Sequence, residues 1–226
     1  MKKNYLAFFL LLAPIIFASA QETGKERLSY AFGMVIAEDL LGIGFEFDYN
    51  QFTRGFSDVM ENKETGITME EAMAYIDAAF MQINAMQMEQ RRIEGEKNRA
   101  EGESFLARNA EKPGVIVTPS GLQYEVLSEG TGEKPGPDDT VLVHYRGETL
   151  GGAVFDSSYE CGEPLIVPLD RVIAGWSEGL RLTNEGSKVR LYIPSDLAYG
   201  ENGVGQDIGP NELIIFDVEL ITIIQN

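Results

Sequence analysis

The stretch LIIFDVEL, Leu213 to Leu220, alternates apolar and acidic side chains in its second half. A period of two is typical of a β-strand, because successive side chains point to opposite faces of a sheet. Segments 122–126, 141–145 and 189–193 show similar patterns, with glycine- and proline-rich turns between the strands. One short helical segment, 174–182, interrupts them. Strands with a single helix predict an α+β domain, an antiparallel sheet wrapped over that helix.

The residues before this domain have helical patterns. Segment 26–41 carries apolar residues at roughly helical spacing and is expected to stop at Gly42. Asp48 can cap a second helix, and a capping box begins a third helix at Thr68. No proline interrupts this third helix before Pro113, which predicts a helix of roughly 60 Å at 1.5 Å per residue.

The third helix changes character along its length. Its first half has apolar residues spaced three and four apart, from Met73 to Ile83, as in a coiled-coil seam. Four of the eight methionines lie within residues 73–88, and they indicate either packing against other helices or a second subunit, or an adaptable surface that holds unfolded chains. Segment 89–111 is dominated by charge and contains Gly95 and Gly102. We expect this polar half to bridge two bodies through solvent.

The amino terminus has the composition of an export signal. Lys2 and Lys3 precede an apolar run over 5–17, and Ala18-Ser-Ala20 provides small residues at a cleavage position. The run is short for a membrane span, so a signal peptide over residues 1–20 is expected, with an uncleaved anchor as the alternative. No cysteine stands at the junction to carry a lipid.

The overall composition excludes several classes of function. Cys161 is the only cysteine, so an exported chain cannot form an internal disulfide. The net charge of −18 argues against nucleic-acid binding, which needs basic side chains to displace counterions. His144 is the only histidine, and its alternation with Tyr145 on a strand turns it outward if Tyr145 faces inward. We expect neither a metal nor a cofactor, because the ligand clusters and nucleotide loops they need are missing.

Five aromatic residues come from separate segments near strand ends or loops. They could form an ordinary core or line a pocket. They are Tyr145, Phe155, Trp176, Tyr199 and Phe216.

The segments around these aromatics resemble the FKBP-type peptidyl-prolyl cis-trans isomerases, in family order across residues 113–226. The matching segments are VHYRG (143–147), VFDSS (154–158), RVIAGW (171–176), LAYGENGVG (197–205) and IGPNELIIFDVEL (208–220). The resemblance implies an antiparallel half-barrel over one short helix.

The upstream region, with the run FLARNAEKPGVIVTPSGLQYEVL (105–127), is similar to the macrophage infectivity potentiator branch. The resemblance implies an exported dimer with four parts. They are a signal peptide (1–20), a helical dimerisation module (21–67), a long linker helix (68–112) and the isomerase domain (113–226). The periplasm is the expected location, with outer-membrane association or secretion as alternatives.

An isomerase of this kind accelerates rotation about Xaa-Pro bonds, whose barrier is about 18–20 kcal/mol. The twisted transition state needs a dry apolar cup rather than a nucleophile or a metal. The resemblance assigns catalytic roles to Asp156, to the Tyr199 hydroxyl and to the Ile173 backbone N–H. Asp156 could alternatively serve only to accept a hydrogen bond from Tyr145. The resemblance assigns substrate binding to Tyr145, Phe155, Leu165, Val172, Trp176, Ile208 and Phe216.

Three positions depart from the family pattern. Leu165 stands where relatives have an aromatic or small residue, and Cys161 where they often have a polar or basic partner for the aspartate. Asp207 adds charge to an apolar rim. The expected partners are unfolded polypeptides that contain proline, macrolide inhibitors, and a second copy of the chain through the N-terminal helices. A client-binding chaperone is the rival function, and an adhesion role is a weaker third.

Overall fold

The computed structural model describes residues 14–44 and 46–224, so residues 1–13 of the expected signal peptide lie outside it. The chain divides into two compact units, one up to Ile83 and one from Asn84 onward. Its longest helices are α1 (Pro14–Ile43), α2 (Tyr49–Met60) and α3 (Met69–Asn109). Among the described residues, no helix combines the length and the hydropathy that a membrane crossing requires.

Helix α1 is longer than the predicted segment 26–41. It passes through Gly42 and ends where the backbone of Gly44 turns left-handed, with φ of 83°. The prediction for the next helix is confirmed, because the Asp48 carboxylate accepts hydrogen bonds from the N–H groups of Asn50 (2.9 Å) and Gln51 (3.2 Å). Each bond satisfies a donor that the first turn of α2 leaves open.

The capping box at the start of α3 is also confirmed. The backbone N–H of Thr68 donates to Glu71 Oε2 (2.8 Å), and the N–H of Glu71 donates to Thr68 Oγ1 (3.1 Å). From there α3 runs for 41 residues without a break at Gly95 or Gly102.

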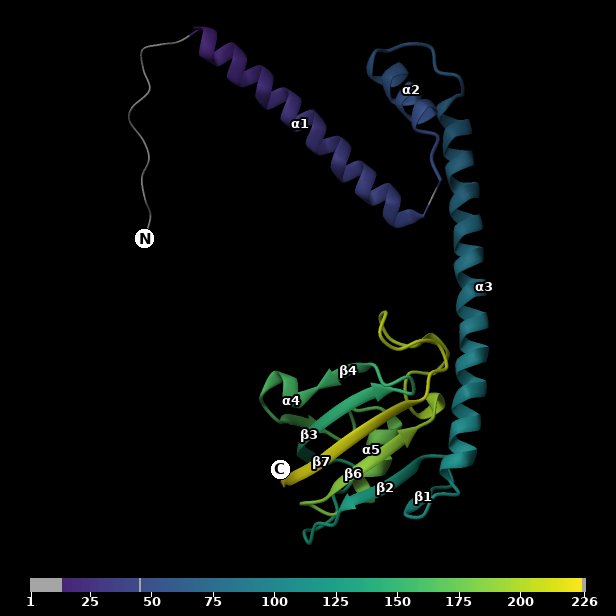
Figure 1. Cartoon of the computed structure of the whole chain (residues 1–226), viewed down its shortest axis with the longest axis vertical. Helices are drawn as coiled ribbons and strands as arrows, with labels where there is room; N and C mark the ends of the chain where they lie inside the picture. Colours follow the sequence, from purple (N-terminus) through teal and green to yellow (C-terminus); the bar gives the residue numbers. More distant parts are fainter. Residues whose placement is uncertain (1–13, 45, 225–226) are drawn as a thin grey trace. The chain divides into compact units, whose positions relative to one another are not determined.

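The second unit contains the predicted α+β architecture, an antiparallel sheet with short helix α5 (Ala174–Arg181) against it (Figure 1). Within the described residues the strand order is β1-β2-β6-β7-β3-β4, with β5 also paired to β3. The strands are β1 (Val115–Val117), β2 (Gln123–Ser128), β3 (Thr140–Thr149), β4 (Val154–Ser157), β5 (Leu165–Pro168), β6 (Lys188–Ile193) and β7 (Ile214–Ile224). A one-turn helix, α4 (Ser158–Cys161), follows β4, and two 3₁₀ turns, η1 (Ser195–Leu197) and η2 (Gly200–Asn202), follow β6.

Helix α5 packs closely on the sheet and forms one core with it. Trp176 and Leu180 of the helix join buried residues of β3, β6 and β7. A side chain at Gly179 would place its Cβ 2.7 Å from Leu191 Cδ2, so glycine is needed for the helix to lie this close to β6. The core residues are Leu122, Val141, Val143, Tyr145, Leu169, Trp176, Leu180, Val189, Leu191, Ile193, Ile208, Ile214, Phe216, Val218 and Leu220.

The prediction that segment 89–111 bridges through solvent is wrong for one face of the helix. Gly95, Gly102 and Asn109 recur every seven residues, and all three are buried. Phe105 and Leu106 pack beside them on a second cluster formed by Tyr192, Leu213 and Ile215. The charged residues occupy the remaining circumference of the helix, and the glycines allow its backbone to pack closely against the rest of the second unit, to which this half of α3 belongs.

Candidate active site

The aromatic side chains predicted from separate segments meet in the second unit. Tyr145 of β3 lies 5.1 Å from Trp176 of α5, and Phe216 of β7 lies 5.0 Å from Trp176 (ring centroids). Phe155 of β4 lies 5.4 Å from Phe216. The interplanar angles of these pairs are 79°, 82° and 85°, the edge-to-face arrangement that aromatic rings favour.

Strand pairing explains how the rings come together. Gly147 in β3 pairs with Asp156 of β4 on one side and with Phe216 of β7 on the other. A Cβ at Gly147 would lie 2.5 Å from Phe216 Cε1 and 2.7 Å from Phe155 Cζ. The two rings therefore occupy the space that the missing side chain leaves.

Trp176 and Phe216 are the most enclosed rings of this cluster, with 5% and 4% of their surfaces exposed. The Nε1–H of Trp176 is buried and has no hydrogen-bond partner among the described residues. The result is a largely apolar site that contains an unsatisfied indole N–H.

Asp156 is the carboxylate at this cluster. The Tyr145 hydroxyl donates a hydrogen bond to Asp156 Oδ2 at 2.8 Å. Burial of the phenol, followed by the nearby carboxylate, raises the pKa of Tyr145. Tyr145 therefore stays protonated and able to donate across the physiological pH range. The 2.8 Å contact confirms the hydrogen bond expected between Tyr145 and Asp156.

Comparisons with known proteins agree with this geometry. Residues 131–221 match the family model described as "FKBP-type peptidyl-prolyl cis-trans isomerase", and residues 25–126 match the "domain amino terminal to FKBP-type peptidyl-prolyl isomerase". The chain is 42% identical over 220 residues to the peptidyl-prolyl cis-trans isomerase Mip of Coxiella burnetii, which covers 97% of this chain and 96% of the relative. The chain belongs to the FKBP family. It is a peptidyl-prolyl cis-trans isomerase.

Two further members extend the comparison. The outer membrane protein MIP of Legionella longbeachae is 37% identical over 206 residues, 91% of this chain and 88% of the relative. The crystal structure of FkpA from Escherichia coli superposes with a TM-score of 0.68 at 32% identity and covers 94% of this chain and 98% of that one. These matches confirm the predicted family, its helical amino-terminal region and the fold class.

The remaining predicted site residues of this FKBP domain fall into two groups. Ile208 is buried in the same core as the four rings, and Val172, Ile173 and Tyr199 pack against that core. Leu165, at the start of β5, is 37% exposed and does not belong to the core cluster.

Two of these residues carry polar groups that were predicted to take part in the site. Ile173 precedes α5, and its carbonyl accepts bonds from the N–H groups of Trp176 (3.0 Å) and Ser177 (3.1 Å). Its own N–H has no partner among the described residues. Burial and then the Asp156 carboxylate raise the pKa of Tyr199, so its hydroxyl keeps its proton.

One supporting residue was missed at the sequence level. The buried Ser158 Oγ accepts a hydrogen bond from the Tyr145 N–H (2.8 Å) and donates one to the Tyr145 carbonyl (3.2 Å). It thereby fixes the strand that carries Tyr145. The signal was present, because Ser158 ends the VFDSS segment two residues after Asp156.

Three other polar residues singled out in the sequence contribute no ring to the cluster. His144 stacks on Tyr159 with a centroid distance of 4.6 Å, as expected for a side chain on the opposite face of β3 from Tyr145. Cys161 and Asp207 are exposed. In the part of the chain that the structure describes, no group of three or more His, Cys, Asp and Glu side chains is arranged to hold a metal ion.

Proposed function

We propose that the proline ring of a substrate binds among Tyr145, Phe155, Trp176 and Phe216, and that the preceding amide rotates there. The observation that carries this proposal is the set of edge-to-face contacts that link these four rings. Rotation removes amide resonance and makes the carbonyl less polar, so an apolar environment stabilises the twisted form more than the planar one. The rotation requires no proton transfer by the protein.

Polar groups at this pocket orient the rotating amide. The unpaired N–H of Ile173 and the neutral hydroxyl of Tyr199 each donate a hydrogen bond to a substrate carbonyl. Asp156 is exposed even though Tyr145 bonds one of its oxygens, so it retains acceptor capacity beside the pocket. We assign it to the electrostatic stabilisation of the twisted carbonyl carbon.

The rim of the pocket is assigned to apolar residues. Val172 and Ile208 contact the residues on either side of the proline, and the more exposed Leu165 contacts a longer substrate. The substrates are unfolded polypeptides that contain proline, and macrolide inhibitors of the family bind the same pocket.

A protease-coupled assay on an Xaa-Pro peptide tests these roles. Asp156→Asn and Tyr199→Phe should each lower kcat/KM by about tenfold, the effect of losing roughly 1.4 kcal/mol of transition-state stabilisation. Asp138→Asn, an exposed carboxylate in the loop before β3, is the matched control. Full activity in both site variants would refute the assignment.

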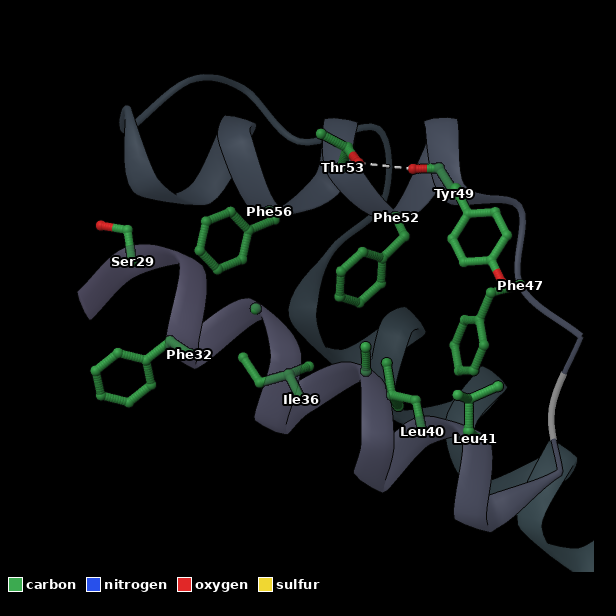
Figure 2. A pocket seen from close by; sticks show the side chains of 12 residues that line it. Ser29, Phe32, Ile36, Leu40, Leu41, Phe47, Tyr49, Phe52, Thr53 and Phe56 are labelled. Carbon is green, nitrogen blue, oxygen red and sulfur yellow. Dashed lines mark hydrogen bonds between the residues drawn. The ribbon is translucent and has the colours of Figure 1, made fainter. Parts of the chain in front are cut away.

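The first unit carries apolar surface suited to a second copy of the chain. A cavity of about 310 Å³ lies between α1 and α2, and Phe32, Ile36, Phe52 and Phe56 line it from both helices (Figure 2). The Phe32 residue, for example, has 62% of its surface exposed. Burial of such area stabilises association by about 25 cal/mol per Å². We propose a homodimer through the N-terminal helices, and a monomer mass in light scattering at micromolar concentration would refute it.

Chaperone activity is the second candidate function for the same cavity. Exposed apolar side chains can also hold unfolded chains, and methionine-rich helices adapt to varied partners. Replacing Phe56 with serine in the full chain should weaken suppression of client aggregation and leave peptide isomerisation unchanged. Unaltered suppression would argue against a client site here.

We propose that the parts of the chain are divided in function along the predicted boundaries. A signal peptide (1–20) directs export, residues 21–67 pair with a second copy, residues 68–112 form the linker helix, and residues 113–226 form the isomerase domain. We propose the periplasm as the location, and cell fractionation with sequencing of the mature amino terminus tests this placement.

A further inference from the structure

The segment 200–211, here called the flap, adjoins one residue of the proposed pocket and contains another. Tyr199 precedes it and Ile208 lies within it. The flap is closed at its neck by the Asn211 N–H, which donates to the Gly200 carbonyl at 2.8 Å. It is pinched nearer its tip, where Val204 and Ile208 exchange backbone hydrogen bonds of 2.9 and 3.2 Å.

The flap has little rigidity of its own. Gly200, Gly203 and Gly205 all adopt φ values near +60° (59°, 60° and 59°), and glycine loses more conformational freedom on ordering than any other residue. Most of the flap between Glu201 and Asp207 is exposed. Contacts from outside the flap therefore have to supply much of its order.

Helix α3 supplies such contacts from one face. Arg91 Nη2 donates to the Asn202 carbonyl at 2.5 Å, and Asn98 Nδ2 donates to the Pro210 carbonyl at 3.0 Å. From the next residue, Arg99 Nη2 donates to Asn211 Oδ1 at 2.8 Å. These donors bond the flap on both sides of its tip, at Asn202 before the tip and at Pro210 and Asn211 after it.

Two glycines bring the helix close enough for these bonds to form. A Cβ at Gly95 would lie 2.9 Å from Asn211 Nδ2 and 3.3 Å from Pro210 Cβ. A Cβ at Gly102 would lie 3.2 Å from Leu213 Cβ, just beyond the flap. Glycine destabilises a helix interior, so its presence at two buried positions favours a packing role over a helix-forming one.

We propose that Arg91, Asn98 and Arg99 are positioning residues of the isomerase, which hold the flap docked so that Tyr199 and Ile208 stay at the pocket. The inference rests on the proposed roles of Tyr199 and Ile208. It makes the second half of α3 part of the catalytic unit.

This role predicts a specific kinetic change. If only the docked flap binds substrate, loosening it lowers the competent fraction and raises the apparent dissociation constant by the same factor. Bound substrate restores docking, so turnover at saturation is nearly unchanged. Loss of folded enzyme would have the opposite signature, a lower kcat at constant KM.

The test uses the full chain with the two donors to flap carbonyls removed, Arg91→Ala/Asn98→Ala. Initial rates over a range of Xaa-Pro peptide concentrations should show KM raised about threefold or more and kcat changed by less than about twofold. Amide hydrogen exchange, read by mass spectrometry, should accelerate across 200–211. The variant Arg91→Lys/Asn98→Ala restores a cation at position 91 and should bring KM part of the way back to the wild-type value.

A wedge variant provides an independent perturbation. Gly95→Leu introduces a good helix former whose side chain meets Pro210 and Asn211, so it should raise KM while preserving the helix. Lys97→Leu adds the same side chain two positions on, roughly 200° around the helix, and should leave KM unchanged.

The outcomes separate the two proposals. Unchanged exchange and unchanged KM in the donor and wedge variants would overturn the positioning role. Faster flap exchange at wild-type KM would also overturn it, and Tyr199→Phe then shows where the reasoning failed. If Tyr199→Phe loses activity, the proposed site stands and only the positioning inference falls. If Tyr199→Phe is fully active, the proposed role of Tyr199 falls as well.

Discussion

A single methyl group at Gly147 would perturb the proposed aromatic pocket without removing any polar group. In Gly147→Ala the new Cβ would lie 2.5 Å from Phe216 Cε1, and 2.7 and 2.8 Å from two atoms of the Phe155 ring. Ordinary contacts begin near 3.4 Å, so the rings have to move by about 0.9 Å. Gly147 pairs with strands on both sides, so the backbone cannot easily yield instead.

The displacement has a cost in stability and a cost in activity. Overpacking a core position destabilises by about 1–3 kcal/mol, and the Phe155–Phe216 edge contact at 5.4 Å contributes about 0.5–1.5 kcal/mol of its own. We expect the free energy of unfolding to fall by about 2 kcal/mol. Because the same rings form the proposed proline pocket, kcat/KM should fall by about tenfold, which corresponds to roughly 1.4 kcal/mol.

The protease-coupled peptide assay measures the activity, and denaturant unfolding measures the stability under conditions where the variant is folded. Gly151→Ala is the matched control, because its Cβ would meet only Thr149 Oγ1 at an ordinary 3.6 Å. It should keep wild-type activity. If Gly147→Ala isomerises peptides at the wild-type rate, the Phe155 and Phe216 rings do not shape the site and the pocket assignment is wrong.

Three other predictions concern separate parts of the chain. Burial and the Asp156 carboxylate raise the pKa of Tyr145. The stability that the neutral phenol contributes is therefore complete below about pH 10, the ordinary tyrosine pKa, and is lost as the pH rises toward the higher pKa of the folded state. The free energy of unfolding of Tyr145→Phe should therefore fall less steeply at alkaline pH than that of the wild type. Cys161→Ser should leave kcat/KM within about twofold of wild type, since the exposed thiol takes no part in the rotation, and an inactive variant would overturn that view. Asp48→Ala should destabilise α2 by about 1 kcal/mol in circular-dichroism unfolding, because two N–H groups lose their acceptor, whereas an unchanged transition would mean that water replaces the cap.

Much of the fold could be predicted because its long elements carry their own pattern. Strands β2, β3, β6 and β7 correspond to the four segments with strand patterns. Strands β1, β4 and β5 have only three or four residues, too few to show a period, and they exist through pairing with β2 and β3. The packed face of α3 was missed because charged residues between the small ones hide a seven-residue spacing.

The site divides along similar lines. The aromatic segments were assigned through family resemblance, whereas composition alone left core and pocket as alternatives. The structure shows that Trp176 and Phe216 are core residues that also contact each other in the ring cluster, and their role in a pocket stays a proposal. The flap contacts were not predictable, because Arg91 and Asn202 are 111 residues apart and only the tertiary fold brings them together.

Trp176 has one more consequence, which concerns spectroscopy. It is the only tryptophan in the sequence, and its buried indole lies at the centre of the ring cluster. Fluorescence excited at the red edge of the protein absorption, where tyrosine does not absorb, therefore originates from this one position. A peptide or macrolide that covers the ring changes the polarity around the indole and hence its emission. The protein thus carries an intrinsic optical probe with which ligand occupancy can be titrated without a label, even while a tryptophan-free client is held elsewhere on the chain.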